Sequence, residues 1–209
     1  MNIRTIARRA ALAGVTATLA VLTACGGGDH SSGGDHGTPA ATGSAAAPAE
    51  ASASTVNDAD VMFAQMMIPH HQQAVEMADL AVTRAGDQEV KRLAAQIKAA
   101  QAPEIATMSG WLAGWGRPVP SPGAEVPHMD HGMPGMISEA DMAALGTASG
   151  REFDRQFLTR MIAHHEGAVT MAQAQLSEGA DARAKDLAGE IITAQQAEID
   201  TMRKILGRL

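Results

Sequence analysis

Two pairs of adjacent histidines occur 94 residues apart in the chain, and each pair lies in the same arrangement of methionines. The first set comprises Met67, His70, His71 and Met77, and the second comprises Met161, His164, His165 and Met171. Imidazole combined with thioether, without a thiolate, suits copper and Cu(I) in particular, although imidazole also binds zinc or nickel. The repeated pattern therefore predicts a metal site, and the softness of its ligands favours copper.

The 94-residue offset continues beyond the histidines. It relates Phe63 to Phe157 and Leu112 to Leu206, with many matched residues in between. A constant offset over about 50 residues indicates a duplicated structural unit. The chemistry of the paired histidines is therefore present twice, or once where the two copies meet.

Glu104 and Glu198 form another matched pair, and each lies between apolar residues at helical spacing. A carboxylate on an apolar helix face is unfavourable unless it is paired or coordinates a cation, so we expect both to lie opposite the histidines. Adjacent helical residues point about 100° apart. We therefore expect one histidine of each pair to face the bundle interior and the other to reach a neighbouring helix or the edge of the apolar stripe.

These groups allow two interpretations. In the first, the histidines hydrogen-bond the glutamates and only fix the register of the helices. In the second, the same groups bind a metal together with the flanking methionines. We favour the metal because the histidine pairs recur at equivalent positions, each with a methionine three residues before it and a glutamate on the following helix.

A further group of soft ligands lies in the Pro- and Gly-rich segment between the two copies. It consists of His128, Met129, His131, Met133 and Met136. Methionines in such a loop have no core to fill, so packing explains them less well than it explains methionines on a helix. The segment is predicted to capture copper by itself or to close over a site in the bundle.

The elements that position these ligands are helical. Apolar residues at spacings of three and four predict helices over 58–84, 88–115, 151–177 and 181–207, with a short helix from 138. The hairpin 58–115, the connector 116–137 and the segment 138–207 together make one unit over 58–209. Two hairpins with apolar stripes predict an all-α fold, an antiparallel four-helix bundle.

The N-terminus is typical of a bacterial lipoprotein. Residues 1–24 have a basic start and a short apolar stretch, as in a signal peptide, and Cys25 follows in the position that is lipidated. Residues 25–57 have the composition of a disordered tether. We expect a secreted protein that lipidated Cys25 anchors to the outer face of the cell membrane.

Charge and composition exclude several functions. Without residues 1–24 the chain has 13 basic and 23 acidic side chains, a net charge of −10, and it has no tyrosine, two tryptophans and three phenylalanines. Such a surface repels nucleic acid and offers little for base stacking. The chain shows no zinc-protease motif, and we expect no organic cofactor and no enzymatic activity. The alternatives are a non-metal structural or interaction lipoprotein with buried His–Glu pairs and, less favoured, a copper-dependent redox enzyme. The sequence does not identify a protein partner.

Residues 66–78, 133–136 and 153–172 closely resemble the family catalogued as domain of unknown function 305, and the similarity covers roughly residues 58–207. The resemblance implies a ferritin-like fold. Because some members are described as extracytoplasmic copper-binding proteins, it also implies copper sequestration or delivery. Ferritin-like proteins often bind two irons through Glu-x-x-His. Met67 and Met161 replace that glutamate here, so a di-iron oxidase is not expected.

Overall fold

The computed structural model of the protein describes residues 55–121 and 133–209. Its helices are α1 (Asp58–Arg84), α2 (Gln88–Gly114), α3 (Glu139–Thr147), α4 (Gly150–Glu178) and α5 (Ala182–Arg208). These two stretches contain no β-strand. The prediction of an all-α bundle is confirmed, and the four long helices begin and end within one residue of their expected positions. Cys25 and the predicted signal peptide lie outside the described residues.

The short loops of the two hairpins end in the residues that start the next helix. Asp87 caps α2 by accepting hydrogen bonds from the backbone N–H groups of Glu89 and Val90. Asp181, 94 residues later, caps α5 in the same way. Such caps satisfy N–H groups that have no partner within the helix. Each cap follows a helix end so closely that α2 and α5 must run antiparallel to the helices before them.

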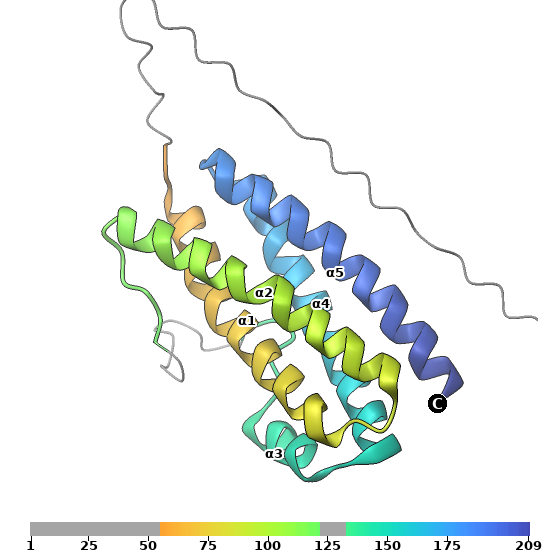
Figure 1. Cartoon of the computed structure of the whole chain (residues 1–209). Helices are drawn as coiled ribbons and strands as arrows, with labels where there is room; N and C mark the ends of the chain where they lie inside the picture. The colour runs from red at the N-terminus through yellow and green to blue at the C-terminus, as the bar shows by residue number, and fades with distance from the viewer. Residues whose placement is uncertain (1–54, 122–132) are drawn as a thin grey trace, which may run out of the picture. The chain divides into compact units, whose positions relative to one another are not determined.

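The two hairpins pack face to face through their first helices. α1 packs along α2 and α4 along α5, α1 and α4 pack against each other, and α2 and α5 have few contacts (Figure 1). The short helix α3 packs against both α1 and α4. None of the described helices is both long and apolar enough to cross a membrane.

The interior consists of two apolar clusters. One contains Met77, Ile97, Phe157 and Met161 among its buried members, and the other contains Phe63, Met67, Met108 and Met171. On each long helix, polar residues lie between the stretches that belong to these clusters. We call this set the histidine layer: His70, His71, Gln101, Glu104, His164, His165, Gln195 and Glu198.

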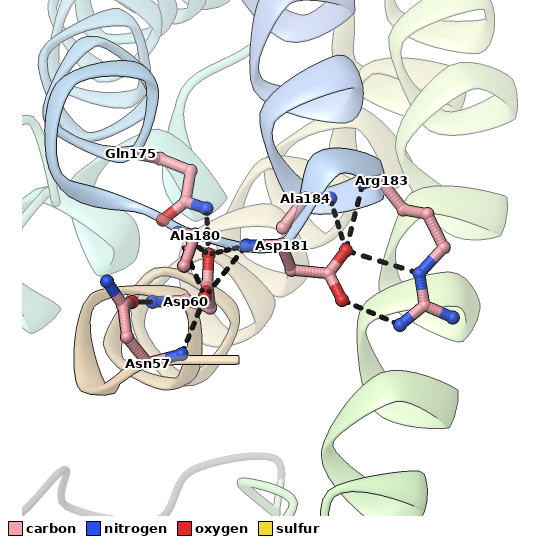
Figure 2. Close-up of polar contacts among 7 residues, drawn as sticks. All are labelled: Asn57, Asp60, Gln175, Ala180, Asp181, Arg183 and Ala184. Atoms are coloured by element: carbon pink, nitrogen blue, oxygen red, sulfur yellow. Dashed lines mark hydrogen bonds and ion pairs between the residues drawn. The ribbon is translucent and has the colours of Figure 1, made fainter. Parts of the chain in front are cut away.

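A buried aspartate at the start of each hairpin binds the loop of the other hairpin. Asp60 of α1 accepts hydrogen bonds from the backbone N–H groups of Ala180 and Asp181 and from the side chain of Gln175 (Figure 2). Its match 94 residues later, Asp154 of α4, accepts from Gly86 N and Asp87 N at 3.0 and 2.9 Å. We call these contacts the reciprocal aspartate clasps.

The clasps were not predicted from the sequence. Asp60 also takes part in a capping box with Asn57 at the start of α1. Burial raises the pKa of Asp60. Hydrogen bonds from the Asn57 backbone, Gln175, Asp181 and Ala180 outweigh burial and hold this pKa below its usual value. The hydrogen bonds therefore favour the ionised carboxylate that the clasp requires.

Replacing either aspartate of the clasps by asparagine should destabilise the fold. Asparagine has one acceptor oxygen and no charge, so each substitution weakens several charge-assisted hydrogen bonds, and we expect a loss of about 2 kcal/mol in the free energy of unfolding. Asp60→Asn should cost more than Asp154→Asn because Asp60 accepts from more donors. Denaturant titration measures both values.

The control is Asp200→Asn on the exposed face of α5, which should leave the unfolding midpoint nearly unchanged. Equal small effects at positions 60, 154 and 200 would contradict a structural role for the clasps.

Candidate metal centre

The second histidine of each pair binds a glutamate of the following helix. His71 Nε2 lies 2.6 Å from Glu104 Oε2, and His165 Nε2 lies 2.7 Å from Glu198 Oε2. The expected contact is therefore present in both copies. The two glutamates are only partly buried, since 19% of each side chain is exposed. This exposure keeps each carboxylate partly solvated and lowers the penalty of placing it in the bundle.

The first histidines of the two pairs meet at the interface of α1 and α4. The rings of His70 and His164 have centroids 3.7 Å apart and are inclined by 35°. All four histidines are 0% exposed. His71 and His165 reach glutamates of the neighbouring helices, as expected for one member of each pair.

Several buried imidazole nitrogens have no hydrogen-bond partner in the protein. They are the Nδ1 atoms of His70, His71, His164 and His165, together with Nε2 of His164. An unsatisfied buried polar atom costs about 1–3 kcal/mol, so a set of five at one level of the bundle is unusual unless it serves to bind a ligand. A metal-binding histidine typically donates its other ring N–H to a carboxylate or carbonyl. His71 and His165 have this arrangement with their glutamates.

His70 has a backbone partner instead of a carboxylate. Its Nε2 lies 3.1 Å from the carbonyl oxygen of Pro134. Because a carbonyl only accepts, this nitrogen carries the proton, and Nδ1 of the neutral ring keeps its lone pair. His164, 94 residues after His70, has no hydrogen bond at either ring nitrogen. The two halves of the centre are therefore not equivalent.

Pro134 belongs to a segment of the connector, Met133–Ile137, that we call the strap. Gln73 of α1 holds its end, donating to the Ile137 carbonyl and accepting from the Ile137 N–H at 3.0 and 2.9 Å. Gly135 has a φ of +79°, which favours glycine. A Cβ on Gly167 of α4 would lie 2.0 Å from the Pro134 carbonyl oxygen. The two glycines allow the strap to lie directly on α4 beside the histidines.

The methionines predicted as ligands occupy different places. Met77 and Met161 belong to one apolar cluster and Met67 and Met171 to the other, on the two sides of the histidine layer. The predicted loop ligands are divided as well. Met133 and Met136 are half-buried in the strap, whereas His128, Met129 and His131 lie outside the described residues.

Two residues of the site were not recognised as such in the sequence. Pro134 contributes a backbone carbonyl, which has no side-chain signal, and Gln73 was part of a motif but was given no role. Within residues 55–121 and 133–209, no group of three or more His, Cys, Asp and Glu side chains is arranged to hold a metal ion. The candidate ligands in the described residues are instead the four buried imidazoles, with the methionines of the two apolar clusters on either side.

The two central histidines are strongly biased towards the neutral form. Burial lowers the pKa of His70 to about 3, the charge of His71 adds to this shift, and the Pro134 hydrogen bond opposes it. Burial also holds the pKa of His164 well below its usual value, with further contributions from His70, His165 and His71. The backbone of His70 opposes the lowering of the His164 pKa. Its contact with the His164 ring does not have the geometry of a hydrogen bond, since both ring nitrogens of His164 lack a partner. Neutral imidazole is the form that binds metal.

Fold and site together define a helical-bundle protein with a buried histidine layer. The chain belongs to the family described as domain of unknown function (DUF305), whose model matches residues 60–206. The resemblance stated from the sequence is confirmed. An uncharacterized protein of Acanthamoeba polyphaga mimivirus, L153, is 45% identical over 53 residues, which cover 25% of this chain and 35% of the viral protein.

Solved structures of the family share the fold. A DUF305 protein of Streptomyces coelicolor, described as secreted, is 39% identical, with a TM-score of 0.66 and coverage of 72% of this chain and 91% of its own. A DUF305 fragment from Deinococcus radiodurans is 37% identical, with a TM-score of 0.66 and coverage of 74% and 99%. CopM in its Cu(I)-bound form is 35% identical, with a TM-score of 0.60 and coverage of 71% and 96%. CopM has also been solved with Cu(II) and with silver.

The buried histidines should make the stability of the metal-free protein depend on pH. Between pH 6.5 and about 3, the unfolded chain binds a proton at His70 that the folded chain does not. Stability is therefore present at neutral pH and is lost as pH falls through this window. One such histidine changes the free energy of unfolding by about 1.4 kcal/mol per pH unit. Denaturant titrations with chelator at pH 7, 6, 5 and 4.5 measure the slope, and His70→Gln should reduce it.

The titrations stay at pH 4.5 and above because most ordinary carboxylates protonate below that pH and would add their own contribution to the slope. An unchanged slope in His70→Gln would show that this ring is not held neutral by the fold.

Proposed function

We propose that this protein binds monovalent copper in the histidine layer and serves to sequester or deliver copper outside the cytoplasm. Copper is here a cargo rather than a resident cofactor, and no catalytic step is assigned. The observation that carries the proposal is the set of buried Nδ1 atoms without partners, two of which belong to rings whose Nε2 contacts a glutamate.

The chemistry of the donors favours Cu(I). Imidazole nitrogens are the available ligands in the layer, and thioethers lie in the apolar clusters on both sides. The sequence has one cysteine, Cys25, so the bundle has no thiolate. Imidazole with thioether, in an apolar and solvent-poor setting, suits a soft monovalent ion better than a hard divalent ion. A single positive charge also has a smaller desolvation penalty than a double one.

The comparisons support the choice of metal. CopM is described in Cu(I)-bound, Cu(II)-bound and silver-bound forms, and the alignment with CopM covers 71% of this chain. Silver(I) is a soft monovalent ion like Cu(I), so a relative that binds both has a site of the chemistry inferred here. We transfer monovalent metal binding to this protein on that basis.

The place of action follows from the N-terminus and from one relative. A signal peptide over residues 1–24 with lipidation at Cys25 would hold the bundle at the outer face of the membrane. The Streptomyces coelicolor protein is also described as secreted. An acidic domain tethered there attracts cations, in agreement with capture of a metal outside the cell.

A purely structural role of the His–Glu pairs is the second candidate, because the hydrogen bonds of His71 and His165 are short and well formed. It accounts for the Nε2 atoms but leaves each Nδ1 atom buried without a partner. The metal accounts for both nitrogens.

Substituting the second histidine of each pair tests the proposal. The double variant His71→Ala, His165→Ala should lose the Cu(I) bound by the bundle, because it removes both rings that the glutamates orient. Competition with a chromophoric Cu(I) chelator, under exclusion of oxygen, measures stoichiometry and affinity. A parallel titration with Zn(II) tests the choice of metal.

The matched variant His128→Ala, His131→Ala should keep the metal of the bundle. If this variant loses the copper and the bundle variant keeps it, the site lies in the connector. A wild-type protein that binds neither ion more tightly than micromolar would refute the proposal.

Removing the carboxylates of Glu104 and Glu198 should weaken metal binding without removing a ligand. We expect Glu104→Gln, Glu198→Gln to lower Cu(I) affinity about 10- to 100-fold, the usual effect of losing the group that orients a metal-binding histidine. Stoichiometry should be unchanged. The control is Glu89→Gln in the first turn of α2, where the half-exposed carboxylate accepts from Arg208 and lies outside the histidine layer. Equal affinities in both variants would show that the glutamates do not orient the ligands.

A further inference from the structure

The interface of α1 and α4 has an open pocket beside the strap. Its volume is about 230 Å³, and it lies between the first turns of α1 and the last turns of α4. Its lining includes Met62, Met66 and Met171, together with Phe63 and Pro134. Three thioethers therefore border one small cavity, and the remainder of its wall is mostly apolar.

Comparison of the two halves of the chain indicates that the fold does not require methionine at positions 62 and 66. At the equivalent place in the other copy, Gln156 replaces Met62 and Arg160 replaces Met66. That side of the interface is covered by α3, where Arg160 donates to Asp141 at 3.0 Å and Leu145 is fully buried. The open side therefore has two thioethers where the covered side has two polar side chains.

The exposure of Met62 argues against a role in packing, since 59% of this residue is exposed. Met66 is half-buried and packs against the edge of one apolar cluster. A methionine at the surface exposes apolar area to water, which is less favourable than exposing a polar side chain at the same position. Met171 is only 6% exposed and forms the floor of the pocket.

We propose that Met62, Met66 and Met171 form a second site for a soft monovalent metal, a thioether capture site at the surface of the bundle. This inference rests on the proposed function in its choice of Cu(I) as the metal. Thioether sulfur is a neutral, polarizable donor that selects Cu(I) and Ag(I) over the harder ions. Because it needs no deprotonation, such a site binds its ion without releasing protons.

The capture site adjoins the histidine layer. Pro134 lines the pocket, and its carbonyl oxygen is 3.1 Å from His70 Nε2. One residue of the strap therefore lies between the thioethers and a buried imidazole. An ion taken from solution at the pocket would be separated from His70 by this one residue of the strap.

Silver(I) added to the full chain, with the methionine methyl groups labelled with carbon-13, tests the inference directly. The methyl resonances of Met62, Met66 and Met171 should shift as the ion binds. Those of Met108 and Met202, which are buried elsewhere in the core, should respond less. Absence of any shift at the three pocket methionines, at silver concentrations that saturate the protein, would overturn the inference. This measurement needs no substituted protein.

Stoichiometry gives the second test. The variant Met62→Leu, Met66→Leu keeps apolar volume while removing two sulfurs, and it should bind one equivalent of Ag(I) fewer than the wild type. Met142→Leu, a half-buried methionine of α3, is the matched control and should bind as the wild type does. Equal binding by all three proteins would refute the capture site.

The same titration separates this inference from the proposed function. If the double leucine variant loses an equivalent and His71→Ala, His165→Ala loses none, the thioether site stands and the histidine site fails. The opposite result retains the histidine site and removes the thioether site.

Discussion

The histidine layer imposes the strictest physical constraint on this bundle. Four imidazole rings without solvent exposure interrupt a core that is otherwise apolar, and each ring nitrogen without a partner opposes folding. Two glutamates that reach solvent and one strap carbonyl satisfy three of the eight ring nitrogens, and the other five have no partner in the protein. The apolar clusters on both sides must provide the stability that the layer does not. The arrangement separates two tasks along the helix axes, because the ends hold the fold while the centre stays available for chemistry.

Such a layer requires accurate axial register, since a shift of one turn would place an imidazole in an apolar cluster. The reciprocal clasps provide that register. Asp60 and Asp154 each fix the start of one hairpin against the loop of the other, at opposite ends of the α1–α4 interface. With both ends fixed, His70 and His164 meet at the middle.

The sequence predicted what periodicity controls. Helical spacing placed His71 opposite Glu104, and the 94-residue offset transferred this pairing to His165 and Glu198. Prediction from the sequence failed where backbone groups or loop geometry determine a contact. The partner of His70 is a carbonyl 64 residues away in a segment without periodicity. The clasps also use backbone N–H groups, although the matched pair Asp60 and Asp154, each with a loop aspartate to follow, was a detectable signal. Burial of all four histidines depends on how closely the hairpins pack, which spacing within one helix does not specify.

The reciprocity of the clasps has a consequence for the symmetry of the bundle. Each hairpin carries both halves of the contact. It has a buried aspartate at its start, and its loop has two N–H groups that donate to the aspartate of the other hairpin. Residue i of one hairpin contacts residue j of the other, and j contacts i, which is the defining property of an isologous twofold interface between identical subunits. The two hairpins therefore meet with the contact geometry of a symmetric pair. The short helix α3, the strap and the open pocket depart from that symmetry, because each lies on one side of the interface only.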